Sequence, residues 1–162
     1  CLSSPEFRLF MIIIGNGGHA SVVRDVIGRA DAIYDNTYGF IAVGDNAARK
    51  REAAQNEHLL YATLIDPSAV VSPSATVGYG TIIMAGVVVQ AEAFIGKFVI
   101  LNTGCTVDHG CVVENFAHIA PGAHLCGDVI VGEGALVGVG ARAVPGASIA
   151  AWTVVKAGET AK

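Results

Sequence analysis

Aliphatic residues recur every six positions along residues 65–149. The fifteen positions of this aliphatic column hold Ile, Val or Leu, except that the small Ala143 occupies one of them. Four residues after each of them, a small-residue column runs from Ala69 to Ala147 and holds nothing larger than Val. Neither an α-helix of 3.6 residues per turn nor one ordinary alternating strand has a period of six. The pattern therefore predicts short strands joined by turns at a fixed spacing, which is a parallel β-helix.

The spacing also predicts the size of this β-helix. Three hexads make one triangular coil of 18 residues, so the 85 residues from 65 to 149 predict nearly five coils. With strands about 4.8 Å apart, the prism would be about 24 Å tall. The aliphatic column would fill its interior, and the small-residue column would leave room at the corners. We expect the glycines that follow an aliphatic residue to supply turns with positive φ; they are Gly78, Gly96, Gly132 and Gly138.

Ahead of the hexads, the pattern changes to that of a small α/β unit. Residues 8–14 contain the apolar run FMIII, which predicts a buried parallel strand. Next comes GNGGHASVVRDVI, in which Gly15, Gly17 and Ala20 satisfy the G-x-G-x-x-G/A spacing at the start of a helix. Such a turn presents backbone N–H groups and the helix dipole to a phosphate, although a glycine-rich turn can also be only a tight connection. His19, at the helix entrance, could face either a ligand or solvent.

A second strand and a second helix follow in the same unit. We predict the strand over residues 38–43 and the helix from residue 47 to about residue 58, capped by Asp45 or Asn46. The three cations at 49–51 are expected to form a solvated face. The unit has room for only two or three strands, which argues against a full dinucleotide-binding domain.

These patterns divide the chain into three parts. Residues 1–7, CLSSPEF, resemble an expression-vector linker. Residues 8–63 form the α/β unit, described as half of a Rossmann fold. Residues 64–162 form the β-helix and a C-terminal tail, so that the fold class is mainly β.

Composition narrows the possible functions. Of 162 residues, 52% are hydrophobic and 15% are charged, and the net charge is −4, which argues against a nucleic-acid partner. We find no apolar run long enough for membrane insertion and no secretory leader, and expect a cytoplasmic protein. Cys105 and Cys111 lie in the small-residue column and Cys126 follows an inward Leu, so we interpret all three as packing residues.

Polar side chains that lie outside the aliphatic and small-residue columns gather in residues 101–128. Besides Asn102, Asp108 and Glu114, this passage contains His109, His118 and His124. Taken singly, a surface histidine is usually unremarkable. His109 and His118, however, are nine residues apart, which is half a coil, so they point from different sides of one prism. Both can serve one site only if that site lies between two subunits, and we therefore hypothesise a homotrimer with three interfacial sites.

Metal binding is the competing use of three histidines. The sequence offers no carboxylate or histidine second shell for such a site, and no metal is expected.

Several motifs together resemble a known family. GNGGHASVV, VGDNAARKR, NTGCTVDHG, NFAHIAPGAHLCGD and VGVGARAVPG are similar to segments of the sialic acid O-acetyltransferase-type family of left-handed β-helix acyltransferases. Within that family, the best-matched branch is that of the bacterial UDP-4-amino-sugar N-acetyltransferases of the bacillosamine type. The resemblance implies a left-handed coil, a trimer, a UDP-amino sugar bound by the N-terminal unit, and acetyl-CoA in a groove between subunits.

The resemblance also implies roles for individual residues. His109 matches the general base that removes a proton from the sugar amine, and Asn102 matches a residue close to that base. His118 matches the second active-site histidine and a cofactor contact. The Gly127 N–H matches the donor to the thioester carbonyl, with Gly122 as a further cofactor contact. The sugar-nucleotide loop is matched by Gly15, Asn16, Gly17, Gly18 and His19. No covalent intermediate is needed, because an amine and a thioester held together react directly.

The chain departs from the family pattern at four places. The base is followed by Gly110 instead of an acidic residue, which leaves Asp108 as a differently placed substitute. Ser21 stands where Lys is common. Between Tyr34 and Phe40 the family has a longer passage with an acidic pair, of which Asp35 is the remaining match. After residue 149 the hexad register stops, and AAWTVVKAGETAK resembles a family C-terminus joined directly to the fifth coil.

Three functions are consistent with these observations. We favour an acetyl-CoA-dependent N-acetyltransferase acting on a UDP-linked amino sugar. An O-acetyltransferase of the same fold, acting on a sialic acid or related sugar, is the first alternative, because the sequence does not show whether the nucleophile is an amine or a hydroxyl. A noncatalytic trimeric scaffold or impaired homologue is the second.

Overall fold

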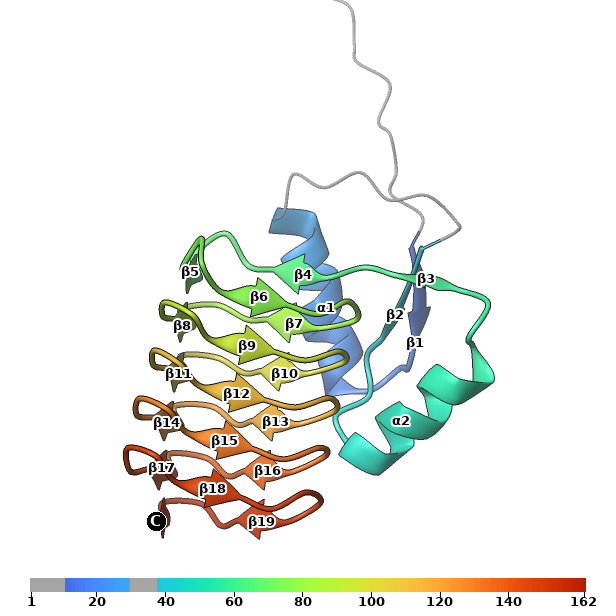
Figure 1. Cartoon of the computed structure of the whole chain (residues 1–162). Coiled ribbons are helices and arrows are strands. Elements are labelled where there is room, and N and C mark those ends of the chain that lie inside the picture. Colours follow the sequence, from blue (N-terminus) through green and yellow to red (C-terminus); the bar gives the residue numbers. More distant parts are fainter. Residues whose placement is uncertain (1–10, 30–37) are drawn as a thin grey trace, which may run out of the picture.

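The computed structural model describes residues 11–29 and 38–162. The linker-like residues 1–7, the start of the predicted first strand and Asp35 lie outside the described residues. Figure 1 shows a prism of stacked coils with a smaller α/β unit against one side.

Three parallel sheets form the sides of the prism (Figure 1). Sheet I contains β4 (Leu64–Ile65), β7 (Ile82–Ile83), β10 (Ile100–Leu101), β13 (His118–Ile119), β16 (Leu136–Val137) and β19 (Val154–Val155). Sheet II contains β5 (Val70–Val71), β8 (Val88–Val89), β11 (Thr106–Val107), β14 (His124–Leu125), β17 (Arg142–Ala143) and β20 (Thr160–Ala161). Sheet III contains β6 (Thr76–Val77), β9 (Phe94–Ile95), β12 (Val112–Val113), β15 (Ile130–Val131) and β18 (Ser148–Ile149).

The register confirms the 18-residue coil. Each strand pairs with the strand one coil later, as Leu101 does with Ile119 and Val107 with Leu125. From Ile83 to Ile149 both predicted columns are buried in one continuous core along the prism axis, whereas Ile65, in the first coil, is exposed. Cys105 and Cys111 are buried in that core as packing residues, and burial raises the pKa of Cys105 to about 12.

The predicted end of the prism at residue 149 was wrong. The ladder continues through β19 and β20, so that the three sheets hold six, six and five strands and make between five and six coils. Val155 and Ala161 extend the aliphatic column, and Val144 N–H donates to the Ala161 carbonyl at 3.1 Å. Thr153 and Glu159 occupy the small-residue positions, and both are exposed. The size limit that defined the column therefore does not hold in the last coil that the structure describes.

The glycines that follow aliphatic residues also have a different role from the predicted one. Positive φ occurs three residues after each aliphatic residue from Val77 onward, for example at Gly104 (φ 64°) and Gly140 (φ 61°). By contrast, Gly78, Gly96, Gly132 and Gly138 are absent from the residues with positive φ. They lie against the next coil, where a Cβ atom on Gly132 would fall 2.5 Å from the Ala151 nitrogen. These positions therefore require glycine because two backbones approach each other closely.

Two glycine substitutions distinguish the two roles. We expect Gly132→Ala to lower the free energy of unfolding by more than about 2 kcal/mol, because rigid backbone cannot move away from the new Cβ. Gly140→Asn should cost less than about 1 kcal/mol, since nothing lies within 4 Å of a Cβ there and Asn adopts positive φ readily. Urea unfolding measures both, and equal losses would contradict this assignment.

The N-terminal unit alternates strands and helices. Its elements are β1 (Ile12–Ile14), α1 (Gly18–Arg29), β2 (Tyr38–Ile41), α2 (Asn46–Gln55) and β3 (Leu60–Tyr61), and the sheet is parallel in the order β1-β2-β3. Asp45 caps α2, as predicted, by accepting from the Ala48 N–H at 2.7 Å. Strand β2 contacts a different helix on each of its faces. Phe40 packs with the buried residues of α1, and Ile41 packs in the cluster that contains a buried residue of α2.

Helix α1 fills the space between the small sheet and sheet I (Figure 1). Its buried face consists of Ala20, Val23 and Val26, and packs against outward-facing residues of the first three strands of sheet I. Those residues are Leu64, Ile82 and Ile100, none of them more than 3% exposed. Apolar residues at outward positions of a prism therefore mark the surface on which the α/β unit docks.

Arg49 joins α2 to the prism. The predicted solvated face is wrong for this residue, which is 1% exposed. Its Nε donates to the Phe98 carbonyl at 2.8 Å and its Nη2 to the Phe116 carbonyl at 2.7 Å, while its Nη1 donates to the Val43 and Gly44 carbonyls. Burial lowers the Arg49 pKa to about 10, so the guanidinium stays charged at neutral pH.

The neighbouring cations of α2 have different surroundings. Lys50 forms an ion pair with Glu133 and lies over the rings of Phe116 and Trp152, with its Nζ 5.9 and 5.2 Å from their centroids. Arg51 is exposed, as predicted. Only one of the three cations therefore enters the core.

A variant of Arg49 tests its role. We expect Arg49→Met to lower the free energy of unfolding by about 3 kcal/mol or more, because several buried carbonyl groups would lose their donor. The exposed Arg51→Met is the matched control and should change stability by less than about 0.5 kcal/mol. Chemical denaturation checks both, and similar values for the two variants would contradict the role of Arg49.

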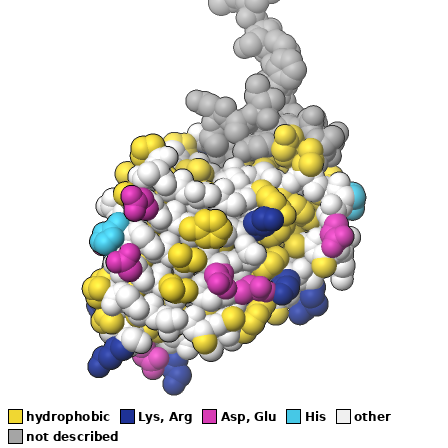
Figure 2. Space-filling view, in the orientation of Figure 1, with side chains coloured by type: hydrophobic (Ala, Val, Ile, Leu, Met, Phe, Trp, Pro, Cys, Tyr) yellow, Lys and Arg dark blue, Asp and Glu magenta, His cyan; other side chains and the backbone are white. Residues whose placement is uncertain are grey.

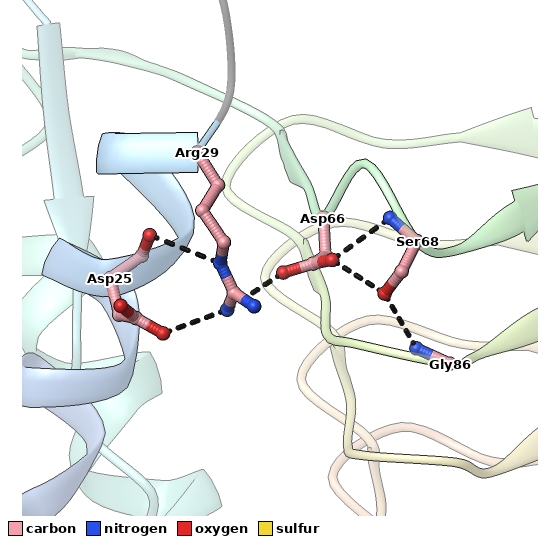
Figure 3. A network of polar contacts seen from close by, with 5 residues as sticks. All are labelled: Asp25, Arg29, Asp66, Ser68 and Gly86. Carbon is pink, nitrogen blue, oxygen red and sulfur yellow. Dashed lines mark hydrogen bonds and ion pairs between the residues drawn. The ribbon is translucent and has the colours of Figure 1, made fainter.

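A second polar contact lies at the opposite end of the docking surface. In Figure 3, Arg29 in the last turn of α1 reaches Asp66, which follows β4, with its Nη2 2.8 Å from the carboxylate. Asp66 also accepts hydrogen bonds from the backbone and hydroxyl of Ser68, and that hydroxyl accepts from the Gly86 N–H. Burial alone would raise the Asp66 pKa, but the Ser68 bonds and Arg29 outweigh it and lower the pKa. The α/β unit is thus attached by polar contacts at both ends of an apolar surface.

Candidate active site

The β1–α1 loop has one constrained glycine and an open surface. Gly15 has φ 121°, and a Cβ atom there would fall 2.7 Å from the Ala42 carbonyl oxygen. Asn16, Gly17 and Gly18 are exposed, and no atom lies within 4 Å of a Cβ on either of those two glycines. The loop therefore combines both interpretations of the motif: Gly15 allows a tight connection, and residues 16–18 at the start of α1 remain accessible to a phosphate.

His19 faces the prism, not the open loop surface. A Cβ atom on Gly44 would fall 2.6–3.1 Å from its ring, which shows how closely the ring covers that glycine. Its ring meets His118 edge to face, with centroids 5.8 Å apart. Its Nε2 is buried and has no hydrogen-bond partner among the described residues. Burial, and next the charge of Arg49, lower the His19 pKa.

His118 is held by contacts from both parts of the chain. Its Nε2 lies 3.1 Å from the Nδ2 of Asn102, and the ring hydrogen-bonds the backbone of Gly44. Burial, then Arg49 and His19, lower the His118 pKa to about 4, so the ring is neutral at physiological pH. A neutral imidazole that donates to the Gly44 carbonyl presents Nε2 as an acceptor for the Asn102 amide. His118 therefore connects the α/β unit to Asn102.

His109 lies on another corner of the prism, in the turn between sheets II and III. Its ring covers Gly127 of the next coil, where a Cβ atom would fall 2.6 Å from Nε2. Asp108 Oδ1 accepts from the His109 backbone N–H at 2.8 Å and so fixes this turn. The Gly127 N–H donates to no described residue, which leaves a free backbone donor beside an imidazole.

Within one chain the residues matched to the site fall into two groups. Asn102, His118, His19 and the β1–α1 loop gather on the side of sheet I, whereas His109, Asp108 and Gly127 gather at the corner between sheets II and III. Asn102 thus contacts His118 and not His109 in the described chain. Gly122 follows sheet I on the same corner as Asn102, and its N–H donates to the Thr103 carbonyl at 3.0 Å.

The remaining polar residues of 101–128 have contacts of their own. His124 Nδ1 lies 2.9 Å from the Thr106 hydroxyl on the outer face of sheet II. Glu114 accepts from the Glu133 N–H at 2.9 Å, between adjacent coils. Across the described ranges, 11–29 and 38–162, no three His, Cys, Asp or Glu residues are grouped as metal ligands.

Sequence reasoning missed Gly44 and Arg49 as neighbours of the histidines. The sequence contained one relevant signal, since both belong to the VGDNAARKR motif. The motif identified a capped helix, but nothing in it indicated that the cation would turn inward. For the part of the chain that the structure describes, no helix is long and apolar enough to cross a membrane.

The His118 environment predicts a pH-dependent stability. Its folded pKa of about 4 lies below the ordinary value of 6.5, so the unfolded chain binds a proton first as the pH falls. Stability should therefore decrease between pH 6.5 and 4, by up to about 3 kcal/mol from this group. His118→Gln should be less stable at pH 7 but should lose less stability over that interval. Unfolding at a series of pH values measures the difference, and parallel curves for the two proteins would refute it.

Solved structures match the chain, whereas no protein-family model and no curated protein matches it significantly. The acetyltransferase domain of PglB from Neisseria gonorrhoeae is 30% identical, with a TM-score of 0.87, over 93% of this chain and 89% of that one. PerB from Caulobacter crescentus, in complex with CoA and GDP-perosamine, is 37% identical, with a TM-score of 0.86, over 93% and 87%. The PglB domain in complex with acetyl coenzyme A matches at 32% identity over 91% and 88%, with a TM-score of 0.83.

Proposed function

Because this chain belongs to the left-handed β-helix acyltransferases that N-acetylate amino sugars on nucleotides, we propose that it transfers acetyl from acetyl-CoA to the amino group of a nucleotide-linked amino sugar. The observation that supports this most directly is the His109 ring against Gly127, whose backbone N–H donates to no described residue. An imidazole can accept the proton that an attacking amine loses, and a free backbone N–H can stabilise the negative charge on a thioester oxygen. The two groups lie on adjacent coils.

In the proposed reaction, the amine nitrogen bonds to the thioester carbonyl carbon and the carbon–sulfur bond breaks. His109 accepts the amine proton and returns it to the departing sulfur. Gly127 donates its N–H to the carbonyl oxygen while the charge develops. Asp108 holds the backbone of His109, so the base keeps its place over Gly127. Much of the acceleration would come from holding the two reactants together.

We assign the nucleotide to the N-terminal unit. Residues 16–18 are exposed at the positive end of α1, which suits a diphosphate. His118 and Asn102, which lie where this unit meets sheet I, would position the sugar. We favour a UDP-linked sugar on the sequence resemblance. The matched PerB structure contains GDP-perosamine, so GDP sugars are the direct competitor.

The two groups of residues can meet only across subunits, and we propose a trimer. Sheet III lies between the His109 corner and sheet I, and it exposes Phe94 (47%) and Ile130 (46%), with Val112 between them. Figure 2 shows hydrophobic side chains on this face of the prism. A neighbouring prism packed there would cover these residues and bring one subunit's His109 toward another's Asn102 and His118. Because both substrates are cytoplasmic metabolites, we place the reaction in the cytoplasm.

Replacement of His109 tests the proposed chemistry. With acetyl-CoA and UDP- or GDP-linked 4-amino sugars, we expect wild-type protein to release CoA thiol and His109→Ala to lose about 10²–10⁴-fold in kcat/KM. His124→Ala is the matched control, since that ring contacts Thr106 on sheet II, and it should retain near wild-type activity. Absence of turnover with every nucleotide sugar would refute the function.

His109→Ala, combined with a variant of Asn102, also tests the interfacial site. Mixing His109→Ala with Asn102→Ala subunits should restore part of the activity, because some interfaces would then contain one intact copy of each residue. Lack of restoration after verified subunit exchange would place each site within one chain.

A further inference from the structure

A cleft lies between α2, β3 and the corner of the prism that joins sheet III to sheet I. Its volume is about 710 Å³, which is within the range of small-molecule sites. Its described lining includes neither His109 nor Asn102, so the cleft is separate from the candidate active site. Five aromatic side chains line it, two from the α/β unit and three from turns of successive coils. They are Tyr38, Tyr61, Tyr79, Phe98 and Phe116.

The rings of the cleft form flat walls at right angles to one another. Tyr61 and Tyr79 lie at an interplanar angle of 11° with centroids 6.4 Å apart, and Phe98 meets both of them edge to face. Phe116 is parallel to Phe98, with centroids 5.1 Å apart. A planar group can therefore stack on one pair of rings while its edge meets the other pair, which are the two arrangements that aromatic rings favour.

The cleft is open because small residues face it from α2. Ala53 and Ala54 border it on that side, where larger side chains would fill the space. Its apolar walls are accessible to solvent, since Leu60 is 58% exposed and Tyr79 is 46% exposed. The concave shape suits a small ligand better than a flat protein surface.

Two lysines already lie over rings that border the cleft. Lys97 Nζ is 4.6 Å from the Tyr79 centroid, and Lys50 Nζ is 5.9 Å from the Phe116 centroid. These ammonium groups take the positions that a ligand cation would occupy over an aromatic face, so the cleft disfavours a cationic ligand. Lys50 is paired with Glu133, whereas Lys97 has no ion pair within residues 11–29 and 38–162. The Lys97 ammonium can therefore receive an anion.

The α2 side of the cleft has the opposite charge. Glu57 borders the cleft there, and a carboxylate accepts hydrogen bonds from N–H or O–H donors. A ligand that matches both sides has an anionic group near the prism and a donor near α2.

We propose that this cleft binds a small planar aromatic ligand that carries an anionic group at one end and a hydrogen-bond donor at the other. The ring stacks on the aromatic walls, the anionic group pairs with Lys97, and the donor reaches Glu57. A nucleotide with an amino-substituted base and an amino-substituted aromatic acid share this chemistry. The inference does not depend on the proposed function, because the cleft and the candidate active site are separate.

Calorimetric titration of the intact protein tests the inference with three probes. AMP and 4-aminobenzoate represent the two sources of the ligand, and 4-aminobenzamidine has the ring and amino group of the second with a cationic end. Excess CoA and UDP are present throughout, so that any site for those molecules is filled. We expect saturable binding of at least one anion, and the probe that binds more tightly identifies the source. The amidine should bind about tenfold more weakly or not at all, because the lysines repel it.

Variants locate the binding in the cleft. Ala54→Trp fills the cleft from an exposed position of α2 and should weaken binding of the anion about tenfold or more. Lys97→Gln should weaken it about 2–5-fold, as expected for an exposed charge pair. Lys156→Gln removes an exposed cation from another part of the prism and should leave the affinity unchanged.

Three results would overturn the inference. They are the absence of binding by both anions, equal binding of the amidine, and anion binding that Ala54→Trp and Lys97→Gln leave unchanged.

Discussion

A buried guanidinium that donates to backbone carbonyls connects the two parts of this protein. Arg49 reaches the prism from α2 and donates to the carbonyls of Phe98 and Phe116, which are equivalent positions on successive coils. Asn46, one turn earlier, donates to the Gly134 carbonyl, the next position on that corner. The helix thus binds at least one carbonyl from each of three coils. Because the coils repeat every 18 residues, these acceptors are evenly spaced along the corner.

Arg49 also influences the histidines next to it. Its charge adds to burial in lowering the pKa values of His19 and His118. A neutral His118 can link the Gly44 backbone to Asn102, whereas a protonated ring beside Arg49 would introduce repulsion into a buried region. Attachment of the α/β unit and orientation of Asn102 therefore depend on the same cation.

The coil repeat explains how chemistry arises on a surface made of two-residue strands. Residues 18 apart in sequence are neighbours in space, so the turn at 109–110 is paired with the turn at 127–128. A base and a free backbone donor can then come from two short turns without any long loop. Gly110, which departs from the family pattern, leaves room for the Asp128 carboxylate of the adjacent turn.

The sequence by itself determined the prism, because a six-residue period predicts stacked short strands and both columns are buried from Ile83 to Ile149. It also predicted the capped helix α2, the glycine turn between β1 and α1, and the concentration of polar side chains in residues 101–128. It misjudged features that depend on contacts between coils or between the two units. The ladder continues past residue 149 because backbone pairing does not depend on which side chains occupy the small-residue column, and Gly132 is required by the approach of the next coil. The burial of Arg49, the pairing of His118 with Asn102, and the placement of Asp128 over Gly110 were decided by tertiary structure alone. Each depends on a backbone carbonyl, an amide or an empty volume from a distant segment, and residue type does not encode these.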